Sequence, residues 1–234
     1  MVLKLSDKLA NSWLGQFLKG VTSAIELRLL THYKQYAQEP STVRALRKIW
    51  KSEIIVLFSP AELWILHELA KAQKHHGGCF AEVGVFRGVS AEIICQAKLP
   101  STELYLFDTF EGLPRPGKLD SRFKERAFSV SEKVVRTRLN KYTRWSVHRG
   151  LFPASAANVQ NKRFSFVHLD VDLYESTLAG LEFFWPRMLE GGILVSHDYS
   201  QCEGVYQAFD DFFQHRTDCR LVELPTTQVM VIKD

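Results

Sequence analysis

Acidic side chains follow two apolar segments of this chain in a pattern that could hold a metal or move a proton. Asp170 and Asp172 follow the largely apolar residues 166–169, with one residue between the two acids, and His197 and Asp198 end the next apolar segment. Neighbouring carboxylates are costly unless a cation or a shared proton balances them, so they indicate a metal site, a proton-transfer site, or both. An acid at a strand end can also be a simple helix cap, and for each segment alone that structural role stays open.

A glycine-containing turn precedes these acids in the chain and could hold a cofactor. It runs from Glu82 through Gly84 and Gly88 to Ser90. Glycines let the backbone approach a ligand closely, and the free N–H groups of a helix start bind carboxylates. The spacing differs from GxGxxG, so a dinucleotide pyrophosphate is a poor fit. Glycines at a strand-to-helix turn can also be purely structural.

Asp108 directly follows the next expected strand, residues 103–107. An acid in this position commonly accepts hydrogen bonds from ribose hydroxyls. The turn and the acid together suit an adenosine-type cofactor that has no diphosphate. S-adenosylmethionine fits, because its carboxylate would meet Ser90 and the turn while its ribose would meet Asp108.

The segments that carry these residues alternate between strand and helix patterns, which predicts an α/β fold with parallel strands and right-handed crossovers. A terminal hairpin, formed by residues 220–224 and 228–232, adds an antiparallel strand and makes the sheet seven-stranded. The other expected strands lie near 79–84, 103–107, 145–148, 164–169 and 192–196, and the expected helices lie near 88–98, 131–140, 175–189 and 203–216.

Residues 1–58 are expected to form an N-terminal helical extension, a lid or a dimer contact, ahead of a domain that spans 59–234. Helical patterns cover residues 5–30 and 41–57. The first is amphipathic, and it could lie on a membrane surface, pack on its own domain or contact a partner subunit. A capping box then predicts a new helix start, with Ser59 as the N-cap and Pro60 at the first helical position.

The composition narrows the functional class. The chain has 234 residues, 46% of them hydrophobic, and a net charge of +4 whose basic residues are scattered rather than grouped on a nucleic-acid face. Its four cysteines form no CxxC pair, which favours reduced thiols. No apolar run approaches the roughly 20 residues of a membrane span, and no secretory signal pattern is present. We therefore expect a cytoplasmic protein that binds neither nucleic acid nor membrane.

Four strings of the sequence resemble the macrocin O-methyltransferase family, whose members methylate sugar hydroxyls of macrolide and aminocoumarin antibiotics. The strings are residues 82–90, 107–114, 150–153 and 169–177, within a match that covers about residues 78–232. The resemblance implies a class I methyltransferase (Rossmann-like) fold, S-adenosylmethionine, a divalent metal that is usually magnesium, and a homodimer.

The resemblance also assigns roles to residues. It implies Asp170 as a metal ligand and Asp172 as the general base. Where the family usually has two adjacent acids, this chain has His197 and Asp198, and an imidazole suits zinc, iron, manganese or nickel better than magnesium. His197 is thus a ligand for a softer metal, a second base, or a mark of a weakened metal site. The implied cofactor residues are Glu82, Gly84, Gly88, Ser90, Asp108, Phe110, Gly150 and Phe152.

These expectations combine into a metal-assisted O-methyltransferase. A metal would grip vicinal oxygens of a small-molecule acceptor, such as a sugar diol or a catechol. The alternatives are a related metal-dependent enzyme of hydroxylase-like type, and a cofactor-binding protein whose metal site has decayed. Residues 115–126 are expected to form part of a lid or a solvated loop. Tyr174, Tyr199 and Trp185 are candidates for facing the substrate, with core packing the alternative for Trp185.

Overall fold

The computed structural model describes residues 57–234 and, ahead of them, residues 21, 22, 24–26, 28, 29, 42, 43, 46 and 49. The chain divides into two compact units, Met1–Ile65 and Leu66–Asp234. The described residues before 57 are all helical. The rest of the helices expected near 5–30 and 41–57 lies outside the described residues, and a boundary after residue 58 stays a prediction.

Helix α4 (Pro60–Ala72) starts where the capping box predicts. The Ser59 N–H donates to Glu62 Oε2 at 2.7 Å, and the Glu62 N–H donates to Ser59 Oγ at 3.3 Å. Pro60 occupies the first helical position, where its missing N–H costs nothing. The predicted helix start is therefore confirmed.

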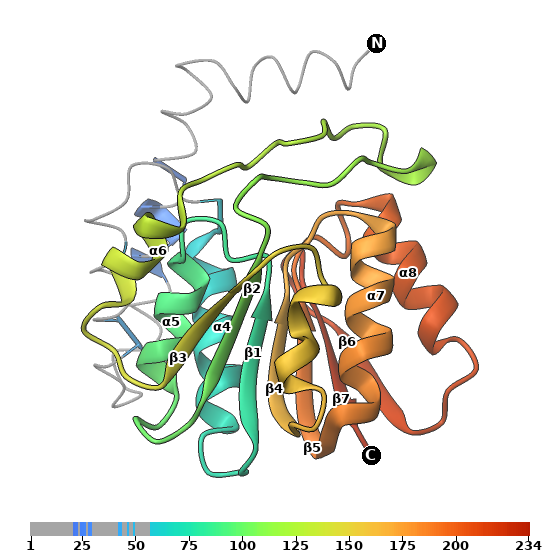
Figure 1. The fold of residues 1–234 in the computed structure, drawn as a ribbon. Coiled ribbons are helices and arrows are strands. Elements are labelled where there is room, and N and C mark those ends of the chain that lie inside the picture. The colour runs from blue at the N-terminus through green and yellow to red at the C-terminus, as the bar shows by residue number, and fades with distance from the viewer. Residues whose placement is uncertain are drawn as a thin grey trace. The chain divides into compact units, whose positions relative to one another are not determined.

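A single seven-stranded sheet forms the framework of the second unit (Figure 1). Its strand order is β3-β2-β1-β4-β5-β7-β6; β1 to β5 run parallel, and β7 pairs antiparallel with both β5 and β6. The predicted seven-stranded sheet with its terminal hairpin is confirmed. The strands are β1 (Cys79–Val83), β2 (Leu104–Asp108), β3 (Trp145–Arg149), β4 (Phe164–Leu169), β5 (Met188–Ser196), β6 (Cys219–Glu223) and β7 (Val229–Lys233).

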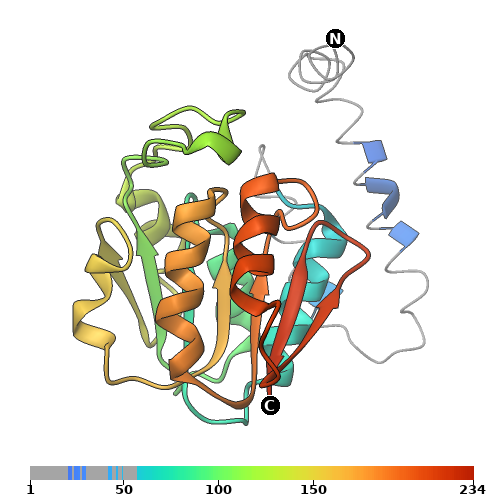
Figure 2. The ribbon, with the colours of Figure 1, turned by 90° about the vertical axis from the view of Figure 1, so that its right-hand side faces the viewer.

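Helices cover both faces of this sheet. Helices α5 (Val89–Ala97) and α6 (Glu132–Leu139) lie on one side, and α7 (Tyr174–Phe184) and α8 (Glu203–Phe213) lie on the other (Figures 1 and 2). The strand order reverses between β1 and β4, and in open α/β sheets ligands bind beyond the carboxyl ends of the strands at such a switch point. No described helix is long and apolar enough to cross a membrane.

One predicted boundary was wrong. The helix expected to reach residue 189 ends at Phe184, a 3-10 turn spans Trp185–Arg187, and β5 already begins at Met188. Pro186 explains the difference, because it lacks the N–H that would continue the α-helical ladder. The remaining strand and helix predictions in this unit agree with the structure to within a few residues.

The core is rich in aromatic side chains. Phe107, Phe164 and Phe184 are fully buried and pack edge to face, and the full burial of each such side chain contributes about 1.5–3 kcal/mol. Trp185 is 1% exposed, packs on Phe213 and donates its Nε1–H to Asp218. Core packing is thus its role, as the sequence alternative proposed.

Candidate functional site

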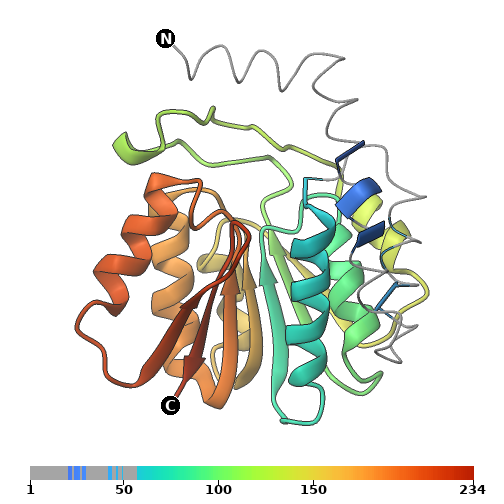
Figure 3. The ribbon, with the colours of Figure 1, turned by 180° about the vertical axis from the view of Figure 1, so that it is seen from behind.

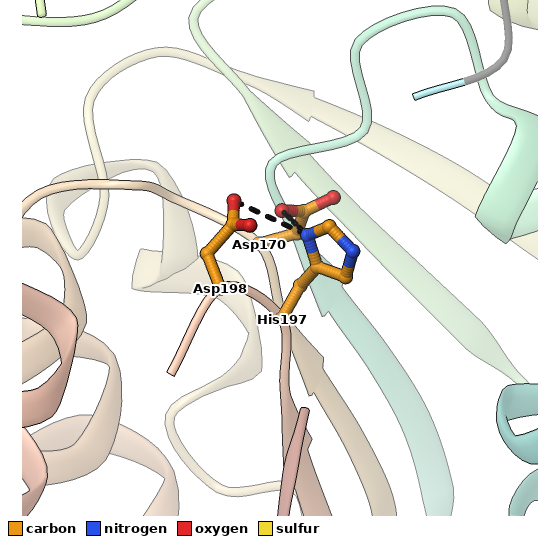
Figure 4. Close-up of side chains that lie close together, drawn as sticks. All are labelled: Asp170, His197 and Asp198. Carbon is orange, nitrogen blue, oxygen red and sulfur yellow. Dashed lines mark ion pairs between the residues drawn. The ribbon is translucent and has the colours of Figure 1, made fainter. Parts of the chain in front are cut away.

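Two strand ends bring Asp170, His197 and Asp198 together. His197 Nδ1 lies 3.3 Å from Asp170 Oδ1 and 3.2 Å from Asp198 Oδ2, so the ring nitrogen sits between two carboxylates (Figure 4). Backbone pairing aligns the segments, because the His197 N–H donates to the carbonyl of Leu169 directly before Asp170. The predicted convergence of these three side chains is present in the structure.

The backbone beyond β4 and β5 bends sharply to achieve this convergence. Asp172 and Asp198 have φ angles of +61° and +59°, in the left-handed region that non-glycine residues rarely adopt. The Leu173 N–H also bonds the Val171 carbonyl across Asp172. Such conformations typically cost about 1–3 kcal/mol each and concentrate at functional sites. The chain has therefore left the extended conformation by Asp172, and residues with a left-handed backbone orient Asp172 and Asp198.

Asp172 lies against Asp198 and Cys202. One ligand atom from each of the three residues lies within 4.8 Å of the others. Burial raises the pKa of Asp172 well above its usual range, and the charges of Asp170 and Asp198 raise it further. Burial also raises the pKa of the Cys202 thiol to about 12, which keeps it protonated. Sequence reasoning missed Cys202, because a single cysteine at a helix start carries no pattern.

The donor set of Asp170, His197 and Asp198 fits a divalent cation. Their donor atoms lie within 4.8 Å of one another, and neighbouring ligands around an ion with bonds of about 2.1 Å are separated by about 3 Å. One nitrogen and two carboxylates suit a borderline metal better than magnesium. A protonated imidazole held between the two carboxylates would give the same distances. The geometry is therefore consistent with a bound metal ion and also with a metal-free ion pair at His197.

Gly84 has a structural task at the end of β1. Its φ is +86°, and a Cβ there would lie 1.8 Å from the backbone carbonyl oxygen of Asp170. The Asp170 N–H in turn donates to the Val83 carbonyl. Glycine is thus required at this position to let the Asp170 backbone pass, whatever else the turn binds.

Asp108 holds the glycine turn in place. Its Oδ2 accepts from the N–H groups of Val85 and Phe86, both at 2.8 Å, and its Oδ1 accepts from the Phe110 N–H at 2.6 Å. A carboxylate offers about four acceptor positions, so one is left for a further donor. Asp108 therefore preorganises the turn, and its predicted role toward a ribose depends on that remaining position.

Glu82 lies beneath the turn rather than on it. It is fully buried, and His168 Nδ1 lies 2.8 Å from its Oε1. Burial raises the pKa of Glu82, an effect that Ser90 opposes, and burial lowers the pKa of His168 to about 4. Both effects favour a neutral hydrogen-bonded pair at neutral pH. Ser90 itself is 2% exposed in the first turn of α5.

The other predicted cofactor residues differ in their surroundings. Gly88 starts α5 with a φ of +77°, and Gly150 follows β3 with its N–H bonded to the Asp108 carbonyl. Phe110 is 6% exposed. Phe152 packs against the rings of Phe107 and Phe184, so it belongs largely to the aromatic core.

A cavity of about 310 Å³ opens beside Gly150, at the ends of β2 and β3. Arg149 crosses its rim to Glu111, with 3.1 Å between the charged atoms. Of the predicted site residues only Gly150 lines it, and the cavity is separate from the carboxylate cluster. Its lining comprises Thr109, Glu111, Gly112, Leu113, Pro114, Glu125, Arg126, Arg149, Gly150 and Leu151.

Tyr174 and Tyr199, the two tyrosines considered as substrate contacts, both contact α8. The Tyr174 hydroxyl donates to Asp211 on the surface of α8. Tyr199 is 7% exposed and packs on Phe209. Tyr174 is thus joined to α8 through its hydroxyl, whereas Tyr199 packs its ring against α8.

Solved structures share this architecture, which is the class I methyltransferase fold. The O-methyltransferase NovP superimposes with a TM-score of 0.67 at 19% sequence identity, over 90% of this chain and 99% of NovP. CalS11, a calicheamicin methyltransferase, gives a TM-score of 0.64 at 18% identity, over 84% of this chain and 92% of CalS11.

Sequence comparison assigns the chain to one family within this fold. Residues 63–229 match the model of the macrocin O-methyltransferase (TylF) family, and the chain belongs to that family. It is 30% identical over 141 residues to 8-demethyl-8-(2,3-dimethoxy-α-L-rhamnosyl)-tetracenomycin-C 4'-O-methyltransferase of Streptomyces olivaceus, 53% of either chain. It is 26% identical over 152 residues to demethyldecarbamoylnovobiocin O-methyltransferase of Streptomyces niveus, 58% of either chain. The chain thus matches just over half the length of these curated relatives.

Proposed function

We propose that this chain is an S-adenosylmethionine-dependent O-methyltransferase that acts, with a divalent metal, on a hydroxyl of a glycosylated small molecule. The observation that carries the proposal is the meeting of Asp170, His197, Asp198 and Asp172 at the switch point of a class I methyltransferase sheet. Family membership supports it, as do the relatives in Streptomyces, whose names describe O-methylation of antibiotics, in one case of a rhamnosyl derivative.

The cofactor site in this proposal joins the glycine turn to the adjacent cavity. The turn, fixed by Asp108, would receive the amino acid part and the ribose, and the cavity beside Gly150 would receive the base. Bound S-adenosylmethionine supplies an electrophilic methyl group on a sulfonium sulfur. The Thr109–Leu113 backbone and Arg126 would exclude water from this side.

The acceptor chemistry would rest on the carboxylate cluster. Asp170, His197 and Asp198 would hold the metal, which lowers the pKa of a bound hydroxyl and orients vicinal oxygens. Asp172 would take the hydroxyl proton as the oxygen–carbon bond forms and the carbon–sulfur bond breaks. The products are then a methyl ether, S-adenosylhomocysteine and one proton on the Asp172 carboxyl.

A labelled-donor assay tests the proposal. The full chain is incubated with S-adenosylmethionine carrying a labelled methyl group, with manganese or magnesium, and with a panel of rhamnosides, TDP-rhamnose and catechol. We expect label in a methyl ether of at least one sugar, and loss of transfer with chelator. Cofactor binding without transfer to any of these acceptors would instead favour the decayed-site alternative, in which His197 replaces the metal between the two acids. A cytoplasmic homodimer remains a prediction for size-exclusion chromatography and cell fractionation.

A further inference from the structure

The 110–128 loop, between β2 and α6, crosses the carboxyl ends of the strands and reaches the starts of α7 and α8 (Figures 1 and 3). It folds back on itself near its base, where the Leu113 N–H bonds the Ala127 carbonyl and the Arg126 N–H bonds the Leu113 carbonyl. At its tip, the 3-10 turn Lys118–Asp120 places one carboxylate against the body of the unit.

That carboxylate belongs to Asp120, which is 1% exposed although most of the loop around it is exposed. Both of its oxygens lie 3.2 Å from the backbone nitrogen of Tyr174, at the first residue of α7. The N-cap residue of α7, Leu173, has no side chain that can cap. Asp120 therefore supplies from a distant loop the cap that α7 lacks, at a helix end where a negative charge is favoured.

Helix α8 is built to admit the same carboxylate. A Cβ at Gly204, in its first turn, would lie 2.0 Å from Asp120 Oδ1 and 2.9 Å from the Tyr174 backbone nitrogen. The N-cap residue of α8, Cys202, also makes no side-chain capping bond. Asp120 thus sits between two helix starts, and glycine at 204 makes the space for it.

The two helix starts are the ones that follow the candidate catalytic residues. Asp172 precedes Tyr174 by two residues, and the Asp198 carbonyl accepts from the N–H of Cys202. A second hydrogen bond joins the loop to the turn between β5 and α8, because Arg122 donates to the Gln201 carbonyl at 2.7 Å. The loop is therefore fastened to the two turns that carry Asp172 and Asp198.

We propose that Asp120 is a positioning residue, which fastens the 110–128 loop across the site by capping α7 and filling the space at Gly204. The base of this loop lines the cavity through Glu111, Leu113 and Arg126. A fastened loop presents that cavity already formed, so a ligand need not order it on binding. The effect of the loop on ligand binding rests on the proposed function, whereas the fastening of the loop does not.

Limited trypsin digestion of the full chain tests the fastening, because the loop carries exposed cleavage sites at Lys118, Arg122, Lys124 and Arg126. Asp120→Ala should speed cleavage within 118–126 by about tenfold or more. Gly204→Ala should do the same with every loop site intact, since the new Cβ expels the carboxylate. Glu203→Gln is the matched control, because it removes an exposed acid from the same helix start and should cleave like the wild type.

The double variant Asp120→Ala/Gly204→Ala decides whether the two changes act through one contact. We expect it to cleave no faster than Asp120→Ala, since the severe clash at 2.0 Å needs the carboxylate, and the other close approach, 2.9 Å to the Tyr174 nitrogen, does not involve the loop. Multiplied effects, or an Asp120→Ala rate equal to that of Glu203→Gln, would overturn the fastening. Circular dichroism checks that each variant is folded, and should one of the single variants not fold, the rate of the other decides.

Calorimetry with S-adenosylhomocysteine as the probe tests the positioning role. Asp120→Ala should raise its Kd by about fivefold or more, because the closed loop is populated for only a fraction of the time. Glu203→Gln should leave the Kd unchanged. An opened loop with unchanged Kd would overturn the positioning role. A wild type that does not bind the probe would instead overturn the proposed function and the positioning role with it, while trypsin digestion still decides the fastening.

Discussion

Asp172 occupies a position where its backbone, its neighbours and its proposed role are linked. Its left-handed φ turns the side chain toward Asp198 and Cys202, away from the direction that a continued strand would give it. Such strain persists only where the surrounding structure enforces it, which is common at catalytic sites.

Replacing Asp172 by Asn should separate chemistry from binding. We expect kcat to fall by about 10²–10⁴-fold, the usual cost of losing a positioned general base, while affinity for S-adenosylmethionine stays near the wild-type value. Steady-state kinetics and calorimetry measure the two quantities. Glu175→Gln, an exposed acid in the first turn of α7, is the control. Near-normal turnover of a folded Asp172→Asn protein would move the base to another residue, with His197 the next candidate.

His197 should set the metal preference. With an imidazole between two carboxylates, the wild type should bind manganese, zinc or nickel more tightly than magnesium. His197→Asp restores an all-oxygen set and should shift the preference toward magnesium. A titration of both proteins with each metal measures the shift. If magnesium alone supports full activity and His197→Asp alters nothing, His197 is not a ligand.

At the scale of elements, the ends of β1 and β4 are locked together by the approach of Gly84 to the Asp170 carbonyl. Gly84→Ala should therefore destabilise the protein for two reasons, the positive φ and the clash. Gly77→Ala isolates the first, because Gly77 has a φ of +89° with nothing within 4 Å of an added Cβ. We expect Gly77→Ala to lower the free energy of unfolding by about 1 kcal/mol. Gly84→Ala should lower it by about a further 1–3 kcal/mol or more, as measured by urea unfolding. Equal losses would mean that the Asp170 backbone yields without cost.

Sequence patterns located the strands and helices of the sheet domain well, because each apolar pattern is set by neighbouring residues in the chain. They failed at residues 188 and 189, where a single Pro186 outweighs a helical pattern. They also missed the tasks of Glu82 and Asp108, which pair with His168 and with backbone amides. Those partners depend on which strands become neighbours and how far the turns fold back. The convergence of Asp170, His197 and Asp198 was predictable, because carboxyl ends of parallel strands share one edge.

For the whole molecule, cofactor binding should appear as a gain in stability. S-adenosylhomocysteine at about 100 times its Kd would add about 2.7 kcal/mol, which corresponds to a rise in Tm of roughly 5–10 °C. NAD should produce no rise, because the turn is not built for a pyrophosphate. Differential scanning fluorimetry measures both ligands side by side. A rise with NAD equal to that with S-adenosylhomocysteine would contradict the assignment of the turn.

Strand β7 lies between β5 and β6, although it is the last of the seven strands along the chain. Its residues Val229 and Val231 are fully buried, and among the described strands it alone pairs with β5 on that side. During synthesis on a ribosome, the first five strands can pair while the outer edge of β5 still has nothing to bind. That interval exposes an apolar strand edge to other nascent chains, a recognised route to aggregation. The yield of folded protein from a cell should therefore depend on how soon residues 229–233 leave the ribosome, and on chaperones that cover β5 until they do.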